Sequence, residues 1–182
     1  MCGIVGMIAP SHLNANRDTL AAMAKAVSHR GPDGEGFFFD GPVGFGHRRL
    51  SIIDLEGGRQ PLSNEDGTVT TIFNGEIYNY RELTTQLKAK GHVFTTHSDT
   101  ETLVHLYEEH GMDMLHQLRG MFAFALWDRK RQTVFLARDR YGVKPLYYRS
   151  DSGTLYFASE IKPFYATGYS PQANERAVHL YL

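Results

Sequence analysis

The sequence predicts an α+β sandwich in which antiparallel sheets lie inside and helices lie outside. Residues 120–127 and 133–137 are apolar on both faces, and residues 155–158 form a shorter segment of the same kind. Such segments are typical of strands that are covered on both sides, as in a layered protein. The connection at residues 128–132 is short, which favours antiparallel pairing of the strands it joins, because parallel strands require a long crossover.

The first half of the chain is predicted to contain four strands and one helix. The apolar segment at residues 4–9 indicates a buried strand, and residues 17–28 place apolar side chains at helical spacing with polar positions between them. Two short strands are predicted around residues 37–39 and 43–47, because an Asp-Gly-Pro turn separates them. A further strand is predicted at residues 68–73.

Capping signatures predict two helices in the middle of the chain. Asn79 with Glu82, and Ser98 with Glu101, each match an N-cap residue followed by its reciprocal partner three positions later. Apolar residues at helical spacing follow each signature, and Gly91 ends the first helix.

Composition is that of one ordinary globular domain of 182 residues. The 19 basic and 20 acidic side chains are well mixed and the formal charge is −1, so binding to nucleic acid or to an anionic membrane is not expected. A single cysteine excludes an internal disulfide framework and fits a reducing compartment. The apolar stretch at residues 3–10 is short and has no basic leader, so neither a signal peptide nor a membrane span is expected. The predicted location is the cytoplasm.

The single cysteine, Cys2, lies directly after the initiator Met1. If Met1 is removed, one residue carries both a nucleophilic thiol and a free α-amine, and such an amine titrates near pH ~8 and can act as a base. The alternative interpretation is that Cys2 is a small apolar residue at the start of a buried strand.

Five short motifs occur in one order along the chain. They are Met1-Cys2-Gly3-Ile4-Val5-Gly6, His29-Arg30-Gly31-Pro32-Asp33-Gly34, Gly46-His47-Arg48-Arg49-Leu50-Ser51-Ile52-Ile53-Asp54, Phe73-Asn74-Gly75-Glu76-Ile77-Tyr78-Asn79 and Ser98-Asp99-Thr100-Glu101. Together they resemble the class II, N-terminal-nucleophile glutamine amidotransferase domain of glutamine-hydrolysing asparagine synthetases. The resemblance implies an Ntn-hydrolase fold, a four-layer αββα sandwich with two antiparallel sheets.

The resemblance also implies a division of the chain into two parts. Residues 1–166 would form the glutaminase domain. Residues 167–182 would form a linker and the start of a helix leading to a synthetase domain that this chain lacks.

The activity implied by the resemblance is hydrolysis of L-glutamine to glutamate and ammonia through a cysteine thioester. Cys2 would be the nucleophile and its own α-amine the general base. The side-chain amide of Asn74 and the backbone N–H of Gly75 would stabilise the oxyanion. An Asn-Gly pair is also the commonest hairpin turn, which is the alternative interpretation of these two residues.

Further residues are implied to bind the two charged ends of glutamine. Arg49 would bind the α-carboxylate, for which a planar guanidinium is well suited. Asp99 and Glu76 would bind the α-ammonium group, although an acidic residue in the first turn of a helix is often only stabilising. The pocket would also be lined, mainly through main-chain atoms, by Leu50, Ser51, Ile52 and Ile53.

No cofactor and no metal are expected in this domain, since the nine histidines show no metal-ligand spacing. ATP and magnesium are expected only in the absent synthetase domain, because its Ser-Gly-Gly-x-Asp-Ser phosphate loop does not occur in this sequence. The expected partners are L-glutamine and an ATP-pyrophosphatase synthetase domain or subunit, with a homodimer left open.

Three other functions fit these residues less well. An amidotransferase domain of another pathway, in aminosugar, purine or natural-product biosynthesis, is disfavoured by Pro32-Asp33-Gly34, because the corresponding segment of the aminosugar and purine families commonly continues with other residues. A regulatory module that only binds glutamine would not need Cys2 or oxyanion donors. An N-terminal-nucleophile peptidase would not need the anchors Arg49 and Asp99 for a free amino acid.

Overall fold

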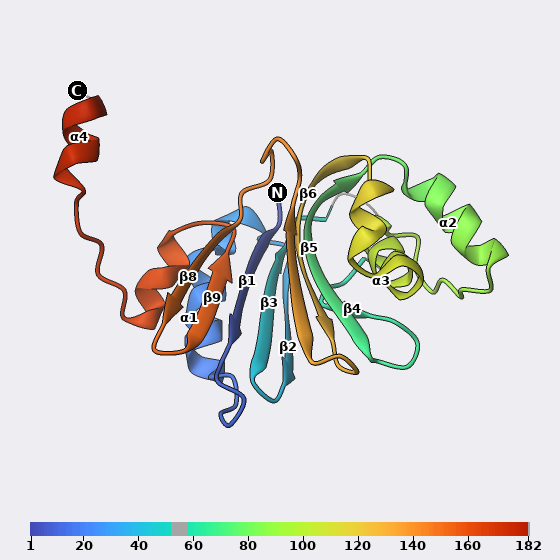
Figure 1. Ribbon diagram of the computed structural model, residues 1–182, viewed down its shortest axis with the longest axis horizontal. Helices are drawn as coiled ribbons and strands as arrows, with labels where there is room; N and C mark the ends of the chain where they lie inside the picture. The colour runs from blue at the N-terminus through green and yellow to red at the C-terminus, as the bar shows by residue number, and fades with distance from the viewer. Residues whose placement is uncertain (52–57, 182) are drawn as a thin grey trace.

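Two antiparallel sheets pack face to face at the centre of the computed structural model, which describes residues 1–51 and 58–181 (Figure 1). The strands of the first sheet, in spatial order, are β2 (Gly34–Asp40), β3 (Val43–Arg49), β1 (Gly3–Ile8), β9 (Thr154–Ala158) and β8 (Tyr147–Asp151). Those of the second sheet are β4 (Leu62–Ser63), β5 (Val69–Ile77), β6 (Gly120–Asp128) and β7 (Thr133–Arg138).

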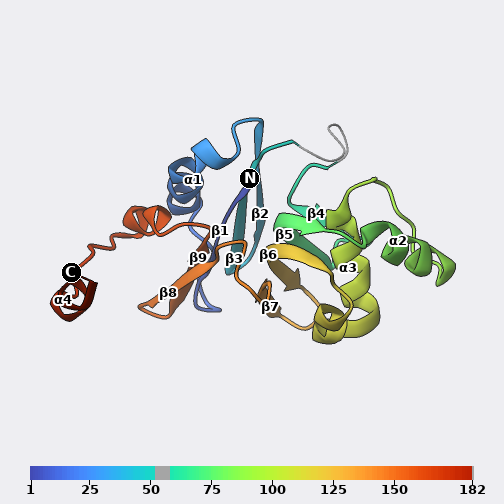
Figure 2. The ribbon, with the colours of Figure 1, turned by 90° about the horizontal axis from the view of Figure 1, so that it is seen from above.

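Helices cover the outer face of each sheet, which gives four layers when the molecule is seen from above (Figure 2). The first sheet is covered by α1 (Arg17–Ala26), with the short 3-10 helices η1 (Ser28–Arg30) and η3 (Lys162–Thr167) nearby. The second is covered by α3 (Asp99–His110), and α2 (Tyr80–Ala89) and the 3-10 helix η2 (Gly111–His116) pack against α3. The predicted αββα sandwich with two antiparallel sheets is confirmed.

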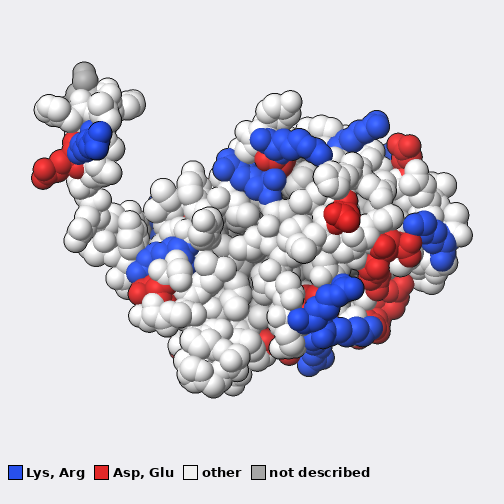
Figure 3. Space-filling model, in the orientation of Figure 1, with Lys and Arg blue, Asp and Glu red and all other residues white. Residues whose placement is uncertain are grey.

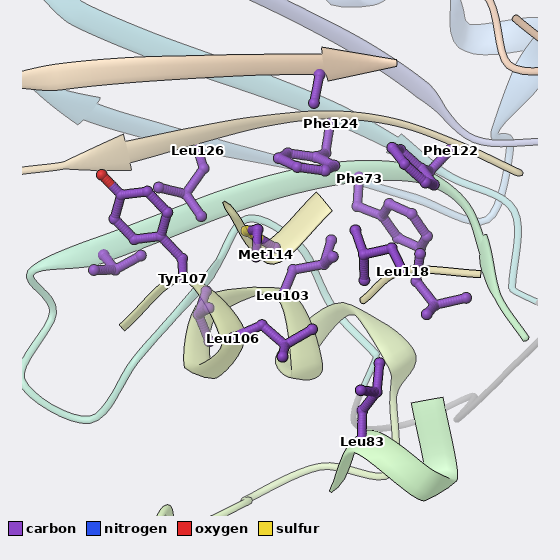
Figure 4. Close-up of a cluster of buried hydrophobic side chains, with 14 of the residues drawn as sticks. Phe73, Leu83, Leu103, Leu106, Tyr107, Met114, Leu118, Phe122, Phe124 and Leu126 are labelled. Atoms are coloured by element: carbon purple, nitrogen blue, oxygen red, sulfur yellow. The ribbon is translucent and has the colours of Figure 1, made fainter. Parts of the chain in front are cut away.

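Three clusters of buried apolar side chains fill the three spaces between the layers. The cluster between the sheets includes Ile4, Phe45, Ile72, Trp127 and Phe157. The cluster under α1 includes Val5, Leu20, Met23 and Val27. The cluster between α3 and the second sheet, drawn in Figure 4, includes Phe73, Leu103, Leu106, Phe122 and Phe124. Strands β1, β5 and β6 therefore contact apolar layers on both sides, which was predicted for β6 from its sequence.

Two strands were not predicted, and both lie at sheet edges. β8 pairs only with β9, and its Tyr147 and Tyr148 are 43% and 75% exposed. An edge strand with exposed side chains has no apolar alternation to reveal it. β4 has only two residues, which is too short for any periodic signal.

The helices after Asn79 and Ser98 were predicted correctly, but the capping box at Asn79 is wrong. The Asn79 side chain makes no capping bond; its Oδ1 accepts a hydrogen bond from Arg119 N and its Nδ2 donates to Gln117 O. Ser98 does cap α3, through Thr100 N. Its predicted reciprocal partner Glu101 instead accepts hydrogen bonds from Thr95 and Thr96, which fixes the segment leading into α3.

The last helix, α4 (Glu175–Tyr181), lies away from the sandwich at the end of an extended segment (Figure 1). Its residues are exposed, with Tyr181 91% exposed. The predicted boundary at residue 166 stays a prediction.

Acidic and basic side chains lie beside one another on the face shown in Figure 3, in agreement with their mixed order in the sequence. Among the described residues, no helix is both long and apolar enough to cross a bilayer.

His47 of β3 lies between the two sheets and is almost completely buried. Its Nε2 is 3.2 Å from the carbonyl oxygen of Phe73 in β5, so a hydrogen bond joins the sheets beside Asn74. Burial lowers the pKa of His47 from its ordinary 6.5 to about 4. The ring is therefore neutral near neutral pH and donates through Nε2.

We expect His47 to make the fold acid-sensitive. In the unfolded chain the ring takes up a proton near pH 6.5, whereas in the folded chain it stays neutral down to about pH 4. The unfolded state thus binds more protons in this window, so stability falls as the pH falls, by about 2 kcal/mol between about pH 7 and pH 5. In His47→Gln, which keeps a donor for Phe73, this part of the pH dependence should disappear from denaturant unfolding curves. The exposed control His116→Gln should retain it, and equal pH dependence in all three proteins would contradict this assignment.

Candidate active site

Strand pairing brings the N-terminus to one end of the two sheets (Figure 1). A pocket lies there, lined by Met1 and Cys2. β1 runs antiparallel to β3, with Gly3 opposite Arg48, so Cys2 lies beside the end of β3. β5 contributes its last residues from the other sheet, and the start of α3 closes one side. Seven of the predicted site residues line this pocket: Cys2, Arg49, Leu50, Asn74, Gly75, Glu76 and Asp99.

The Cys2 thiol is half-buried against the backbone of Leu50. Its Sγ lies 3.4 Å from Leu50 N, which donates to it, and 3.6 Å from Leu50 O. Burial raises the pKa of the Cys2 thiol, and the Leu50 hydrogen bond and the positive charges of the N-terminus, Arg49 and Arg30 offset only part of this rise. The resting group is a protonated thiol, so its use as a nucleophile requires a base.

Asn74 presents a buried amide that lacks a partner. The residue is 1% exposed, and its Nδ2 has no hydrogen-bond partner among the described residues. Leaving a buried donor unsatisfied costs about 1–3 kcal/mol. This cost is recovered when an acceptor, such as a substrate oxygen, enters the pocket.

Asn74 and Gly75 do not form a hairpin turn, so that alternative is wrong. Both lie within β5, where Asn74 is opposite Ala123 and Gly75 is opposite Phe122. A β-carbon on Gly75 would lie 2.3 Å from the carbonyl oxygen of Met121, so the strand pairing there admits only glycine.

The backbone N–H of Gly75 points to the open edge of β5. Two residues earlier, Phe73 N donates to Gln60 Oε1 at 2.6 Å, and two residues later, Ile77 N donates to Asp99 Oδ2 at 3.0 Å. Because N–H directions alternate along a strand, the Gly75 N–H lies between these two on the same side. This edge also lines the pocket.

The acidic side of the pocket favours a cation. Burial raises the pKa of the Asp99 carboxyl, backbone hydrogen bonds such as that from Ile77 oppose this, and the charge of Glu76 adds to the rise. A positively charged ligand group beside these two carboxylates would offset the burial and the repulsion between them.

The remaining predicted residues are not placed in the pocket. Ser51 does not line it; its backbone N–H donates to Asp33 Oδ2 at 2.8 Å. Ile52 and Ile53 lie outside the described residues. Their implied part in substrate binding stays a prediction.

Several residues of the site were not predicted from the sequence. Gln60 lines the pocket and links β5 to α3, since its Nε2 also donates to Thr100 Oγ1 at 3.2 Å. Arg30 holds the backbone of Cys2, because its Nε donates to the Cys2 carbonyl oxygen at 3.0 Å. Lys144 is 6% exposed and its Nζ lies 3.2 Å from Met1 Sδ. Gln60 and Lys144 lie in irregular segments and Arg30 lies in the short 3-10 helix η1. Such segments carry no periodic sequence signal, so only the three-dimensional structure identifies these residues.

The chain belongs to the glutamine amidotransferase domain family, which matches it over residues 1–182. Among curated proteins, the chain is 47% identical to glutamine-hydrolysing asparagine synthetase 2 of Bacillus subtilis (strain 168), over 94% of this chain and 23% of that protein. It is 45% identical to asparagine synthetase 1 of the same organism, over 100% of this chain and 29% of that protein. The resemblance seen in the motifs is confirmed.

Other matches extend the comparison. Amidase chry2 of Gibberella zeae is 42% identical over 94% of this chain and 27% of that protein, so the chain spans about a quarter of the length of these relatives. Among solved structures, glutamine phosphoribosylpyrophosphate amidotransferase of B. subtilis, complexed with ADP and GMP, superposes with a TM-score of 0.76 at 25% identity. That match covers 92% of this chain and 44% of the other. The predicted Ntn-hydrolase fold class is confirmed.

Proposed function

We propose that the chain, after removal of Met1, hydrolyses L-glutamine to glutamate and ammonia. The observation that carries this proposal is the meeting of the Cys2 thiol with the unpartnered Asn74 amide in one pocket. A thiol beside a preformed, unsatisfied donor is what attack on an amide carbonyl requires, because the carbonyl oxygen becomes an oxyanion.

In this mechanism the ends of glutamine bind first. The α-carboxylate binds Arg49, and the α-ammonium group binds Asp99 and Glu76.

The chemical steps follow at Cys2. The α-amine of Cys2 accepts the thiol proton, and Sγ attacks the side-chain amide carbon. Asn74 Nδ2 and Gly75 N–H donate to the oxyanion. The C–N bond then breaks, the protonated α-amine gives its proton to the leaving nitrogen, and ammonia departs. Water then gives a proton to the α-amine and attacks the thioester carbon. The C–S bond breaks, the α-amine returns the proton to Sγ, and glutamate is released with Cys2 regenerated.

We further propose that the ammonia serves a synthetase partner domain or subunit of the asparagine synthetase type. Identities of 45–47% to two proteins of that name support this, as they cover nearly the whole chain. ATP and magnesium would act only in that partner, with residues 1–166 as the glutaminase domain and residues 167–182 as the connection. The single cysteine supports a cytoplasmic setting.

Asn74→Ala is expected to lower kcat for glutamine hydrolysis by about 10²–10³-fold, because one oxyanion donor is lost. The expected change in KM is small, since the amide acts mainly in the transition state. Glutamate release measured over a range of glutamine concentrations tests this. The exposed Asn14→Ala is the matched control. If Asn74→Ala keeps the kcat of the control, Asn74 is not an oxyanion donor.

Arg49→Ala and Asp99→Asn are expected to act mainly on KM. Loss of a charge-assisted hydrogen bond costs about 1.5–3 kcal/mol, which corresponds to a rise in KM of roughly 10–100-fold. Steady-state kinetics with the exposed Arg140→Ala as control checks this. Unchanged KM in both variants would place glutamine elsewhere.

A further inference from the structure

A second group of ligand-type side chains lies outside the Cys2 pocket. His105 and Glu108 are three residues apart on α3, and His92 lies in the segment between α2 and α3. One ring nitrogen of each histidine and one carboxylate oxygen of Glu108 all lie within 4.8 Å of one another. None of the three residues lines the Cys2 pocket.

Glu108 lies within reach of both histidine rings, as a shared metal ligand would. Glu108 Oε2 lies 2.9 Å from His105 Nδ1 and 3.5 Å from His92 Nδ1. Ligand atoms held at about 2.0–2.1 Å from a tetrahedral zinc ion are roughly 3.3 Å from each other. The two Glu108 separations lie on either side of that value, and the three ligand atoms all lie within 4.8 Å of one another, so a bound ion would draw them closer together.

The hydrogen-bond requirements of the two rings point the same way. A neutral imidazole has only one N–H. Both ring nitrogens of His92 nevertheless face carboxylates: Nδ1 faces Glu108, and Nε2 lies 3.0 Å from Glu109 Oε1. His105 has a buried Nε2 without a hydrogen-bond partner among the described residues, 4.0 Å from Glu101 Oε1. A cation bound at both Nδ1 atoms would leave the N–H of each ring on Nε2. That of His92 would then donate to Glu109 Oε1 at 3.0 Å, as is common behind zinc-bound histidines, and Glu101 Oε1 is the carboxylate nearest to that of His105, at 4.0 Å.

Neighbouring side chains already orient these carboxylates. Asn64 Nδ2 donates to the other oxygen of Glu108 at 2.6 Å, so Oε2 stays directed at the histidines. Lys90 Nζ donates to Glu109 Oε2 at 2.6 Å. The phenyl ring of Phe94 lies 4.6 Å from the His105 ring and helps to fix its plane.

We propose that His92, His105 and Glu108 bind one divalent transition-metal ion, with zinc as the best match to two imidazoles and one carboxylate. Water completes the four ligands, because Glu108 and His92 are partly exposed. The ion ties the segment between α2 and α3 to α3. That segment leads directly into Asp99, so the ion stabilises the side of the pocket that carries Asp99. This departs from the sequence-based expectation of no metal in the domain.

The test is zinc titration of the metal-free Cys2→Ala chain near neutral pH, in competition with a chelator of known affinity. Cys2→Ala removes the thiol, which is a competing zinc ligand. We expect one zinc ion per chain, a higher melting temperature with zinc, and the intense visible absorption of four-coordinate cobalt when Co²⁺ replaces zinc.

Two variants in the same background assign the site. His92→Gln and Glu108→Gln should each weaken zinc binding by about tenfold or more and abolish the zinc-dependent rise in melting temperature. The exposed His116→Gln should bind as the parent does. Circular dichroism of the metal-free proteins shows whether each variant is folded, and His92→Gln replaces a side chain that is not fully buried. The absence of stoichiometric binding, or unweakened binding by folded His92→Gln, would overturn the proposal. In that case the rings are held by hydrogen bonds and packing alone.

Discussion

Cys2→Ala is expected to abolish glutamate release from L-glutamine. No other cysteine exists in the chain to replace the nucleophile. Without the thiol no thioester forms, and the oxyanion donors alone cannot deliver an attacking group. Cys2 precedes the first residue of β1 and is only partly buried, so the fold should persist. Coupled detection of glutamate, together with thermal melting of the same samples, measures both effects.

Cys2→Ser is the informative companion variant. It keeps an atom of similar shape that can accept from Leu50 N, but a hydroxyl is a far weaker nucleophile near neutral pH. Activity should therefore fall strongly while glutamine still binds, which calorimetry can show. Persistent glutamate release from Cys2→Ala would mean that the nucleophile has been assigned wrongly, whatever the result with serine.

Retention of Met1 is expected to suppress turnover almost as completely as loss of the thiol. With Met1 attached, the Cys2 nitrogen is an amide and cannot accept the thiol proton. Burial raises the pKa of the thiol, so the thiolate does not form readily by itself. Met1 also lines the pocket, with Sδ beside Lys144, where it restricts the space for substrate.

The measurement requires two preparations whose N-termini are verified by mass spectrometry. One preparation begins at Cys2. In the other the Cys2 amine is blocked, either because removal of Met1 is inhibited during expression or because a residue has been added before Cys2. The processed form should be active and the blocked form nearly inactive, and enzymatic removal of the blocking residue should restore the rate. Full activity of a chain shown to retain Met1 would rule out the α-amine as base.

Local sequence signals were enough for most of the fold. The apolar segments that became β6 and β7 contact packed layers on both faces, and hydrophobicity at consecutive positions reports that burial directly. The edge strand β8 escaped prediction because its side chains are exposed. The Asn79 capping box failed for a related reason: the side chain found long-range partners at Gln117 and Arg119, which no local pattern can reveal.

The sequence by itself determined the family, the layered fold class and the identity of the candidate nucleophile, since these depend on local order: a cysteine at position 2 and motifs in one succession. Only the tertiary structure decided which groups meet. The register of β1 against β3 puts Cys2 Sγ on Leu50, and the backbone N–H groups of Phe73, Gly75 and Ile77 lie along the open edge of β5. The packing of the α2–α3 connection likewise brings His92 to His105 and Glu108. The physical reason is that such contacts join residues far apart in the chain, and strand register and layer packing set them, whereas periodicity reports only which face of an element is buried.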